Sequence, residues 1–324
     1  MVEKMKARKC FVTGGAGFIG SHLVDRLLKD DNQVTVYDKL VLGTDARIKK
    51  HLNKPNFRFV QADLLDFERL KEAMKEHEIV WHLGANTNIR QGNMITDFDL
   101  KNCTTATYHV LEVMRQFGIS QILFSSSACV YGDVPLANVV EDFGPLLPIN
   151  LYGAGKLAGE GLISAYCHLF GIRAWMFRFA NVIGAKMDHG VIFDFIQKLK
   201  KNREVLEVLG DGNQEKPFFL VEDCIEGMLR AYERGNRQCD IYNLGCESFT
   251  IIRRLAQIVV EEMGLSDVRF KYTGEKRGWP GDAPIIHFNI DKMKKLGWQP
   301  KHTSDEAVRI AARRLVNTNL SLEG

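Results

Sequence analysis

The sequence has no marked excess of charge of either sign, because 43 lysines and arginines stand against 40 aspartates and glutamates. A nearly neutral chain does not produce the field that recruits nucleic acid or an acidic membrane surface. No run of about 18 apolar residues occurs, so we expect no membrane-spanning helix. A small molecule is therefore the first kind of ligand to consider.

The chain also lacks the cysteine pattern of a disulfide framework or a structural zinc site. Its seven cysteines are an odd number and include no Cys-x-x-Cys pair. We predict no metal site and expect a reducing, cytoplasmic location. The start of the chain, "MVEKMKARKCFVTGG", runs from charged residues directly into a short apolar segment, without the apolar core of a signal peptide.

Short β-prone runs alternate with amphipathic segments in the first half of the chain. This alternation predicts an α/β fold, a Rossmann-type doubly wound parallel sheet with helices on both faces. Helices are expected at about 66–77, 99–117 and 152–170, and later at about 190–201, 222–234, 250–263 and 304–315. We expect an NAD-binding domain over 1–180 with returns near 222–246, because "CDIYNLG" reads as one more buried strand. A smaller, interleaved α/β substrate lobe is expected mainly over 181–318, and a frayed tail over 319–324.

A glycine-rich segment, "FVTGGAGFIGSHL", follows the first apolar run and opens an amphipathic one. Gly15, Gly17 and Gly20 fit a Gly-x-Gly-x-x-Gly pattern, and Gly14 gives a second frame. In this context the pattern indicates a dinucleotide site, in which glycines let the backbone approach a pyrophosphate. Asp38 ends the next strand, where a carboxylate binds ribose hydroxyls and repels a 2′-phosphate. NAD is therefore expected rather than NADP.

Polar residues also follow the third and fourth expected strands. Asp63 and the run "HLGAN" from His82 to Asn86 fit an adenine pocket less specifically. We interpret His82 as a structural histidine rather than an acid or base. Asn88 and Arg90 fit either a polar ligand or a solvated surface.

Tyr152 and Lys156 lie four residues apart in an expected helix, "LYGAGKLAGEGLISAY", and so share one of its faces. A nearby ammonium favours phenolate and lowers a tyrosine pKa. The pair follows a serine triplet, "ILFSSSACVYG", whose third member is Ser127. Alone, a Tyr-x-x-x-Lys pattern occurs in many helices by chance.

The motifs "GGAGFIG", "SSSACVYG", "YGAGK", "RFANVIG" and "GDGNQ" occur in this order along the chain. In this respect the sequence resembles the extended short-chain dehydrogenase/reductase superfamily, in its NAD-dependent epimerase/dehydratase family, over nearly its whole length. It is most similar to nucleotide-sugar 4-epimerases of the UDP-glucose (UDP-galactose) type.

The resemblance implies that Tyr152 is the base, Lys156 its electrostatic partner and Ser127 a contact to the substrate hydroxyl. Hydride would pass from sugar C4 to NAD, the 4-keto sugar would turn, and hydride would return to its other face. The implied cofactor-binding residues are Gly14, Gly17, Phe18, Ile19, Gly20, Asp38, Lys39, Asp63, Leu64, Leu83, Gly84, Ala85, Asn102, Ser125, Tyr152 and Lys156. The implied substrate-binding residues are Ser127, Asn181, Val191, Lys216, Arg277 and Asp282. A homodimer through 99–117 and 152–170 is also implied.

Residues beside Ser127 distinguish between relatives. Dehydratases and sugar-acid decarboxylases of the family carry carboxyl groups where this chain has Ala128 and Cys129, so both activities are disfavoured. Cys129 with His189 instead resembles the pair of keto-deoxysugar epimerase/reductases such as GDP-fucose synthase. Those enzymes use NADPH, whereas Asp38 favours NAD. A buried cysteine is also more often a small apolar residue of the core than a catalytic group. A binding protein without catalysis is a third alternative, which retention of the reactive residues disfavours.

The expected substrate side departs from the family pattern at two places. Lys216 stands where relatives have an arginine, and lysine offers a point charge rather than a planar fork. Arg277 and Asp282 resemble late nucleotide-binding residues, but the spacing between them is longer here. Trp279 fits a base-stacking role and a packing role equally well.

Overall fold

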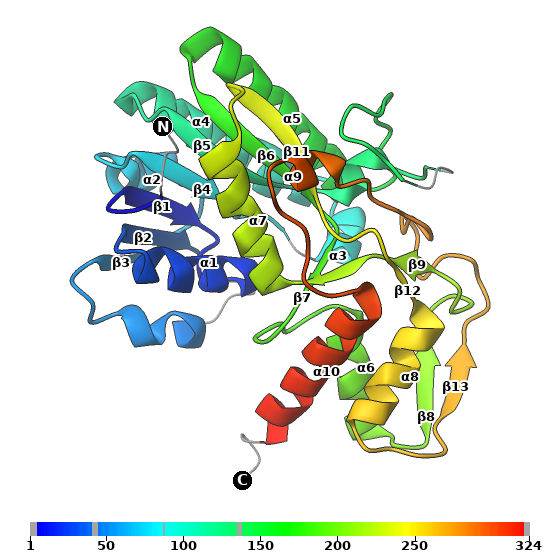
Figure 1. The fold of residues 1–324 in the computed structure, drawn as a ribbon. Helices are drawn as coiled ribbons and strands as arrows, with labels where there is room; N and C mark the ends of the chain where they lie inside the picture. Colours follow the sequence, from blue (N-terminus) through cyan, green and yellow to red (C-terminus); the bar gives the residue numbers. More distant parts are fainter. Residues whose placement is uncertain (1–4, 41–44, 87, 135–137, 321–324) are drawn as a thin grey trace.

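The fold is built on a seven-stranded, all-parallel sheet with the strand order β11-β6-β5-β4-β1-β2-β3 (Figure 1). It is seen in a computed structural model, which describes residues 5–40, 45–86, 88–134 and 138–320. The strands are β1 (Lys9–Thr13), β2 (Gln33–Asp38), β3 (Phe57–Gln61), β4 (Ile79–His82), β5 (Gln121–Ser127), β6 (Arg173–Phe179) and β11 (Cys239–Leu244). The strand order reverses between β1 and β4, which opens a crevice at their carboxyl ends. The predicted Rossmann-type fold is confirmed.

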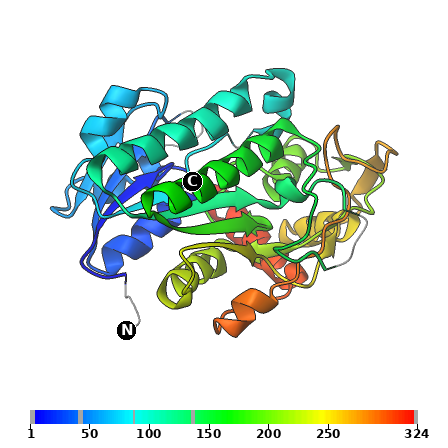
Figure 2. The same cartoon turned by 90° about the horizontal axis from the view of Figure 1, so that it is seen from above.

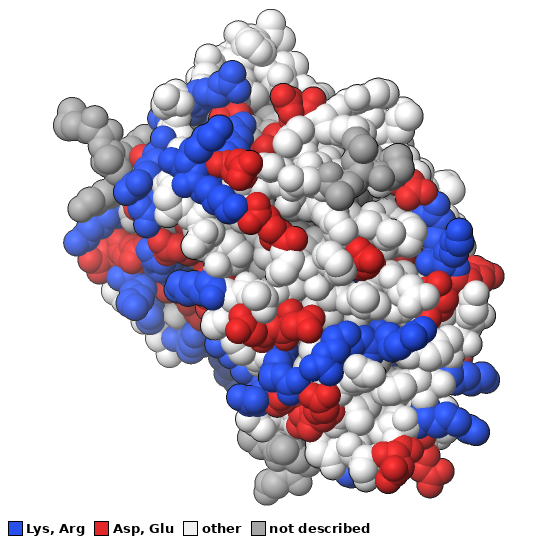
Figure 3. Space-filling view, turned by 45° about the vertical axis from the view of Figure 1, so that its right-hand side comes forward, with Lys and Arg blue, Asp and Glu red and all other residues white. Residues whose placement is uncertain are grey.

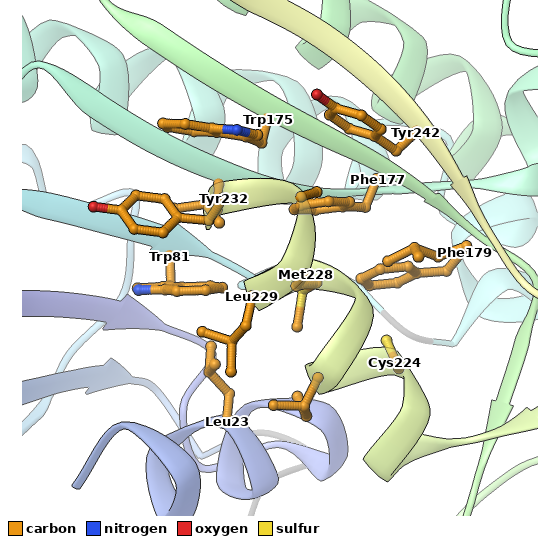
Figure 4. Packing of buried hydrophobic residues seen from close by; sticks show 14 of the residues in the cluster. Leu23, Trp81, Trp175, Phe177, Phe179, Cys224, Met228, Leu229, Tyr232 and Tyr242 are labelled. Atoms are coloured by element: carbon orange, nitrogen blue, oxygen red, sulfur yellow. The ribbon is translucent and has the colours of Figure 1, made fainter. Parts of the chain in front are cut away.

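Helices cover both faces of this sheet, as the view in Figure 2 shows. One face packs against α1 (Phe18–Lys29) and α7 (Val221–Arg234), and the other against α2 (Phe67–Met74), α4 (Ala106–Phe117) and α5 (Leu151–Phe170). On the first face, Trp81 and Trp175 from the sheet lie beside Tyr232 and Met228 of α7 (Figure 4). The sheet is therefore buried on both sides, which is why its strands read as apolar runs.

Shorter elements lie in the connections that follow β2, β4 and β5. They are η1 (Asp45–Arg47), η2 (Lys49–His51), α3 (Ile89–Met94), the π-helical turn η3 (Leu100–Thr105) and η4 (Ala128–Tyr131). The helix expected at 99–117 is thus a π-helical turn that continues into α4. Such turns are rare and are often found at functional sites.

A smaller lobe has its own apolar core. It contains the parallel pairs β7 (Asn181–Ile183) with β10 (Phe218–Leu220) and β8 (Val205–Val208) with β13 (Arg269–Tyr272). It also contains the antiparallel pair β9 (Glu215–Lys216) with β12 (Thr250–Ile251) and the helices α6 (Val191–Lys201), α8 (Ile252–Glu262) and α10 (Ser304–Leu320). Between β10 and β12, α7 and β11 return to the large sheet, and the short helix α9 (Asp291–Lys295) contacts β11. The exact domain boundaries stay a prediction.

Helix α10 ends at Leu320, within the range of the expected frayed tail, which stays a prediction. The helix includes Asn319 and Leu320, because no glycine or proline interrupts the segment from Ser304 onward. Residues 321–324 lie outside the described residues. None of the described helices is both long and apolar enough to cross a bilayer. Basic and acidic side chains are intermixed on the face in Figure 3, as the balanced composition predicts.

Candidate active site

The glycine-rich loop between β1 and α1 brings its backbone unusually close to neighbouring segments. Gly14 has a φ of +68°, and a Cβ there would lie 2.8 Å from the amide nitrogen of Gly84. A Cβ on Gly20 would lie 2.8 Å from Gly15 Cα and overlap the Gly14 carbonyl oxygen. Gly17 precedes the first turn of α1 and makes no side-chain cap, so the amide groups of that turn are available to an anion. The loop thus forms a cradle that fits a pyrophosphate.

Asp38 ends β2 beside this loop. Its carboxylate accepts from the backbone amides of Ala16 at 3.0 Å and Leu40 at 2.9 Å. Burial raises the pKa of Asp38, while these two hydrogen bonds act in the opposite direction. Each oxygen keeps a second lone pair, which can accept from a ribose hydroxyl.

A cavity of about 220 Å³ lies at the switch point of the sheet, and all sixteen predicted cofactor residues line it. Among these lining residues, Lys39 donates to Asn102 at 2.7 Å and to Asp63 at 3.2 Å. Arg47 and Asp188 also line the cavity and pair with each other at 2.8 Å. No local sequence pattern predicts this pair, because Arg47 and Asp188 come from segments about 140 residues apart.

Tyr152 and Lys156 lie on the first turns of α5, whose N-cap is Asn150. The Lys156 ammonium donates to the Ser125 carbonyl at 2.5 Å and lies 5.8 Å from the centre of the Tyr152 ring. Burial raises the pKa of Tyr152 well above its usual value, while a hydrogen bond with Ser127 lowers it. Burial also lowers the pKa of Lys156. Burial therefore opposes the charged form of both Tyr152 and Lys156.

The small residues of α5 explain how this helix fits against the site. A Cβ on Gly153 would lie 2.5 Å from the Cys129 carbonyl oxygen, and one on Gly159 would lie 2.9 Å from the Phe124 ring. Larger side chains would push α5 away from β5 and η4. The glycines therefore fix the positions of Tyr152 and Lys156 relative to the carboxyl end of β5.

A buried ion pair lies one helical turn beyond Lys156. Glu160 accepts from Arg178 of β6 at 2.7 and 3.0 Å, and from the Ser126 hydroxyl at 2.5 Å. The two charged side chains are 5% and 2% exposed. The Arg178 guanidinium also lies 4.7 Å from the centre of the Tyr131 ring. This network connects α5, β5 and β6 directly behind the serine triplet.

A second cavity of about 850 Å³ opens between the sheet and the smaller lobe. Of the predicted substrate residues, it is lined by Ser127, Asn181, Val191, Lys216 and Asp282, and Trp279 also lies on its wall. Lys216 pairs with Asp282 at 2.7 Å and also donates to the Ala283 carbonyl. Arg277 does not line this cavity; its guanidinium contacts Asp133 and the Asp282 carbonyl.

His82 is fully buried between two threonines. Its ring nitrogens lie 2.8 Å from Thr13 Oγ1 and 3.0 Å from Thr107 Oγ1. Burial lowers the pKa of His82 to about 3, so the ring is neutral. A neutral ring held on both sides does not exchange protons with a ligand.

Comparison with known proteins agrees with this arrangement. The model of the NAD dependent epimerase/dehydratase family matches residues 10–245. The chain belongs to that family. It is 34% identical to the putative UDP-glucose 4-epimerase of Methanocaldococcus jannaschii, over 95% of this chain and 98% of that protein. The family confirms the predicted enzyme class and the NAD cofactor.

Two solved structures show how closely the fold is shared. A UDP-galactose 4-epimerase is 35% identical, with a TM-score of 0.85 over 95% of this chain and 99% of that one. A UDP-N-acetylglucosamine 4-epimerase from Methanobrevibacter ruminantium is 27% identical, with a TM-score of 0.85 over 97% of this chain and 99% of that one. The named substrates thus differ between relatives of nearly equal structural similarity.

The residues of this chain fit NAD at the first cavity. The cradle at Gly14 and Gly20 leaves no space for a side chain and admits a phosphate group. Asp38 offers acceptors at the end of β2, and Lys156 of α5 also lines the cavity. NAD would bind across the switch point, with its pyrophosphate at the N-terminus of α1.

Proposed function

We propose that this protein is a nucleotide-sugar 4-epimerase of the UDP-glucose/UDP-galactose type. One observation carries the proposal: Tyr152 lines both the cofactor cavity and the larger second cavity. Ser127 lies on the wall of the second cavity and hydrogen-bonds to the same phenol. A sugar bound there would meet a base and a hydroxyl partner next to the cofactor. The likeness to UDP-sugar epimerases supports this choice.

In this mechanism Tyr152 takes the proton of the sugar 4-hydroxyl and later returns it to the 4-keto intermediate. When bound, NAD would supply the hydride acceptor and then the hydride donor. Ser127 orients the hydroxyl, and its own oxygen also accepts from the Cys129 amide at 3.2 Å, which fixes its position. Lys156, held by the Ser125 carbonyl, adds the positive charge that favours phenolate. The second cavity, with a volume of about 850 Å³, would give the keto sugar space to turn.

The acids on the wall of the second cavity argue against elimination chemistry. They are Asp188, Asp194 and Asp282. Each pairs with a cation, at 2.8, 2.9 and 2.7 Å respectively. Among the described lining residues no unpaired carboxyl group is left to protonate a leaving hydroxyl. This favours epimerisation over dehydration.

The alternative Cys129/His189 mechanism is not favoured by the geometry. Both residues line the second cavity. Burial raises the pKa of the Cys129 thiol, whereas a base needs a lower pKa. His189 hydrogen-bonds to Asp188 at 2.7 Å, and no described contact joins it to Cys129.

The nucleoside diphosphate would lie toward the smaller lobe. Asn181 at the start of β7 and Val191 at the start of α6 lie on one part of the wall, and Lys216 lies on another. The first amide groups of α6 and the Lys216 ammonium are both suited to phosphate oxygens. Lys216 is already paired with Asp282, so we expect the diphosphate to share this ammonium rather than to meet an arginine fork.

The experiment that tests the proposal uses the purified protein with UDP-, GDP-, CDP- and dTDP-sugars, with and without added NAD. We expect the C4 epimer of a UDP-hexose as product, without net change in nicotinamide absorbance. Tyr152→Phe should reduce turnover by at least about 100-fold, the size of a general-base contribution, while NAD stays bound. Stoichiometric NAD reduction, dehydrated product or full activity of Tyr152→Phe would contradict the proposal.

We propose that two copies associate through α4 and α5. These helices expose several large apolar side chains, namely Tyr108, Phe117, Leu169 and Phe170, at 44, 41, 72 and 48%. Exposed apolar groups concentrated on one helix pair are typical of an interface. Leu169→Glu should convert a dimer to a monomer in size-exclusion chromatography with light scattering. A wild-type monomer would refute the dimer.

A further inference from the structure

A carboxylate without a role in the proposed reaction lies directly behind the reactive pair. Asp99 immediately precedes η3 and is fully buried. Its Oδ1 accepts from Asn86 Nδ2 at 2.9 Å, and the Cys103 sulfur lies 3.8 Å from the same oxygen. Its Oδ2 has no hydrogen-bond partner within the part of the chain that the structure describes. A buried carboxylate with so few partners is unfavourable unless a nearby positive charge compensates it.

Asp99 is closely packed between Gly92 and Gly155. On one side, a Cβ on Gly92 would lie 2.8 Å from Asp99 Cγ and overlap its Oδ2. On the other side, a Cβ on Gly155 would lie 3.2 Å from the Asp99 carbonyl oxygen and 2.9 Å from Cys103 Cβ. Gly155 immediately precedes Lys156, so α5 packs onto the Asp99 segment at the reactive turn. The carboxylate is therefore held at a fixed place relative to Tyr152 and Lys156.

The other titratable groups that act on the reactive pair come from three elements. They are Cys103 on η3, Cys129 on η4 and Glu160 on α5. Burial raises the pKa of both thiols, so both cysteines are neutral near pH 7. His82 on β4 also feels the charge of Lys156, but it is neutral because its pKa is about 3. Thiols and imidazole thus supply no compensating charge.

Glu160 is the second carboxylate near Lys156, but its charge is already matched. Arg178 donates two hydrogen bonds to it, at 2.7 and 3.0 Å. Asp99 has no such cation among the residues that the structure describes: its hydrogen-bond partners there are the neutral Asn86 amide and the Cys103 thiol. Among the described residues around the pair, Asp99 is therefore the carboxylate whose charge is available to Lys156.

We propose that Asp99 is a buried carboxylate whose charge acts on Lys156 without a direct ion pair, and a positioning residue that sets the pH range in which Tyr152 acts as a base. For the role of Tyr152 this inference rests on the proposed function. A negative charge stabilises the ammonium and opposes formation of the phenolate. In agreement, Asp99 raises the pKa of both Lys156 and Tyr152. Removing its charge must move both values downward.

The test compares the pH profiles of the wild type and Asp99→Asn, with NAD bound. The acidic limb of kcat/KM reports ionisation of Tyr152, and the alkaline limb reports loss of the Lys156 proton. Both limbs should move to lower pH by about one unit, the lower range for a charge at close distance. Asp97→Asn is the matched control: Asp97 lies two residues earlier, is exposed and pairs with Lys101. It should leave the profile unchanged.

A second readout does not depend on the identity of the sugar. The ultraviolet absorbance of phenolate is titrated in NAD-loaded protein, and the titration of Tyr152→Phe is subtracted. The Tyr152 pKa should be lower in Asp99→Asn than in the wild type. If the buried amide of Asp99→Asn hinders folding, Asp99→Ala serves as a second variant and should give the same shift. It keeps the packing against Gly155, because the Asp99 backbone and Cys103 make those contacts.

The outcomes separate this inference from the proposed function. The role of Asp99 would be overturned if the limbs of the Asp99→Asn pH profile stay in place, move in opposite directions or move toward higher pH. Lower activity with an unshifted profile would also overturn it, because that result indicates a merely structural residue. If no nucleotide sugar is turned over, the proposed function fails, whereas the phenolate titration still decides whether Asp99 acts on Tyr152.

Discussion

The buried pair of Glu160 and Arg178 gives a prediction about stability whose size follows from the geometry. In Glu160→Gln the guanidinium keeps its contacts with the Glu141 carbonyl at 2.9 Å and with the Tyr131 ring, but it loses its counter-charge. The new amide group would also turn a donor toward the Arg178 donors. At 2% exposure, water cannot replace the lost carboxylate. Removing one partner of such a pair costs about 3–5 kcal/mol.

The assay is urea unfolding followed by circular dichroism, since urea does not screen charges as guanidinium chloride does. The control is Glu247→Gln, which breaks the surface pair with Lys294, where both side chains are more than a third exposed. That change should cost less than about 1 kcal/mol. The double variant Glu160→Gln with Arg178→Met should recover part of the loss, because no uncompensated charge stays buried. Equal losses for Glu160→Gln and the control would refute the reasoning.

Two further predictions concern the cradle and the buried histidine. Gly20→Ala should destabilise the fold by about 1–3 kcal/mol, because its Cβ overpacks against Gly14, and it should also weaken NAD binding. Thermal unfolding measures the loss of stability, and calorimetry measures the affinity for NAD. The control is Gly161→Ala, which should be neutral or stabilising because nothing lies near the added Cβ. His82 is neutral in the fold, so below the unfolded pKa of about 6.5 the unfolded state binds one more proton. Stability should fall by up to about 1.4 kcal/mol per pH unit as the pH drops toward 3. His82→Gln should lose this part of the slope, and an unchanged slope would contradict it.

The sequence was informative where a function depends on local chain geometry. The glycine loop, Asp38 at the end of β2, and the pair Tyr152 and Lys156 are each specified by residues close together in the chain. The fold class followed from the alternation of apolar runs, because a parallel sheet buried on both faces requires it. Local sequence therefore predicts where these residues lie in the fold, and their roles stay a prediction.

Other parts of the site depend on contacts between distant segments. Arg47 and Asp188 meet across the cofactor cavity, and no local pattern indicates that they do. Asp99 reads in sequence as one more acidic residue next to a helix, yet it is fully buried. The sequence also could not predict that the pKa of Tyr152 is raised, because this shift depends on how completely the phenol is buried.

The segment that follows β7 connects the two cavities that Tyr152 lines. His22 of α1 contacts the Ala185 carbonyl at 3.0 Å, Arg47 donates to the Lys186 carbonyl at 2.7 Å, and Lys186 pairs with Asp25 at 3.1 Å. The same segment leads directly into α6 of the smaller lobe. The part of the protein built on the seven-stranded sheet therefore binds the segment that leads into the wall of the second cavity. Because this segment is attached on the side of the first cavity, we expect the second cavity to keep a fixed position relative to Tyr152, which the proposed reaction at a single carbon requires.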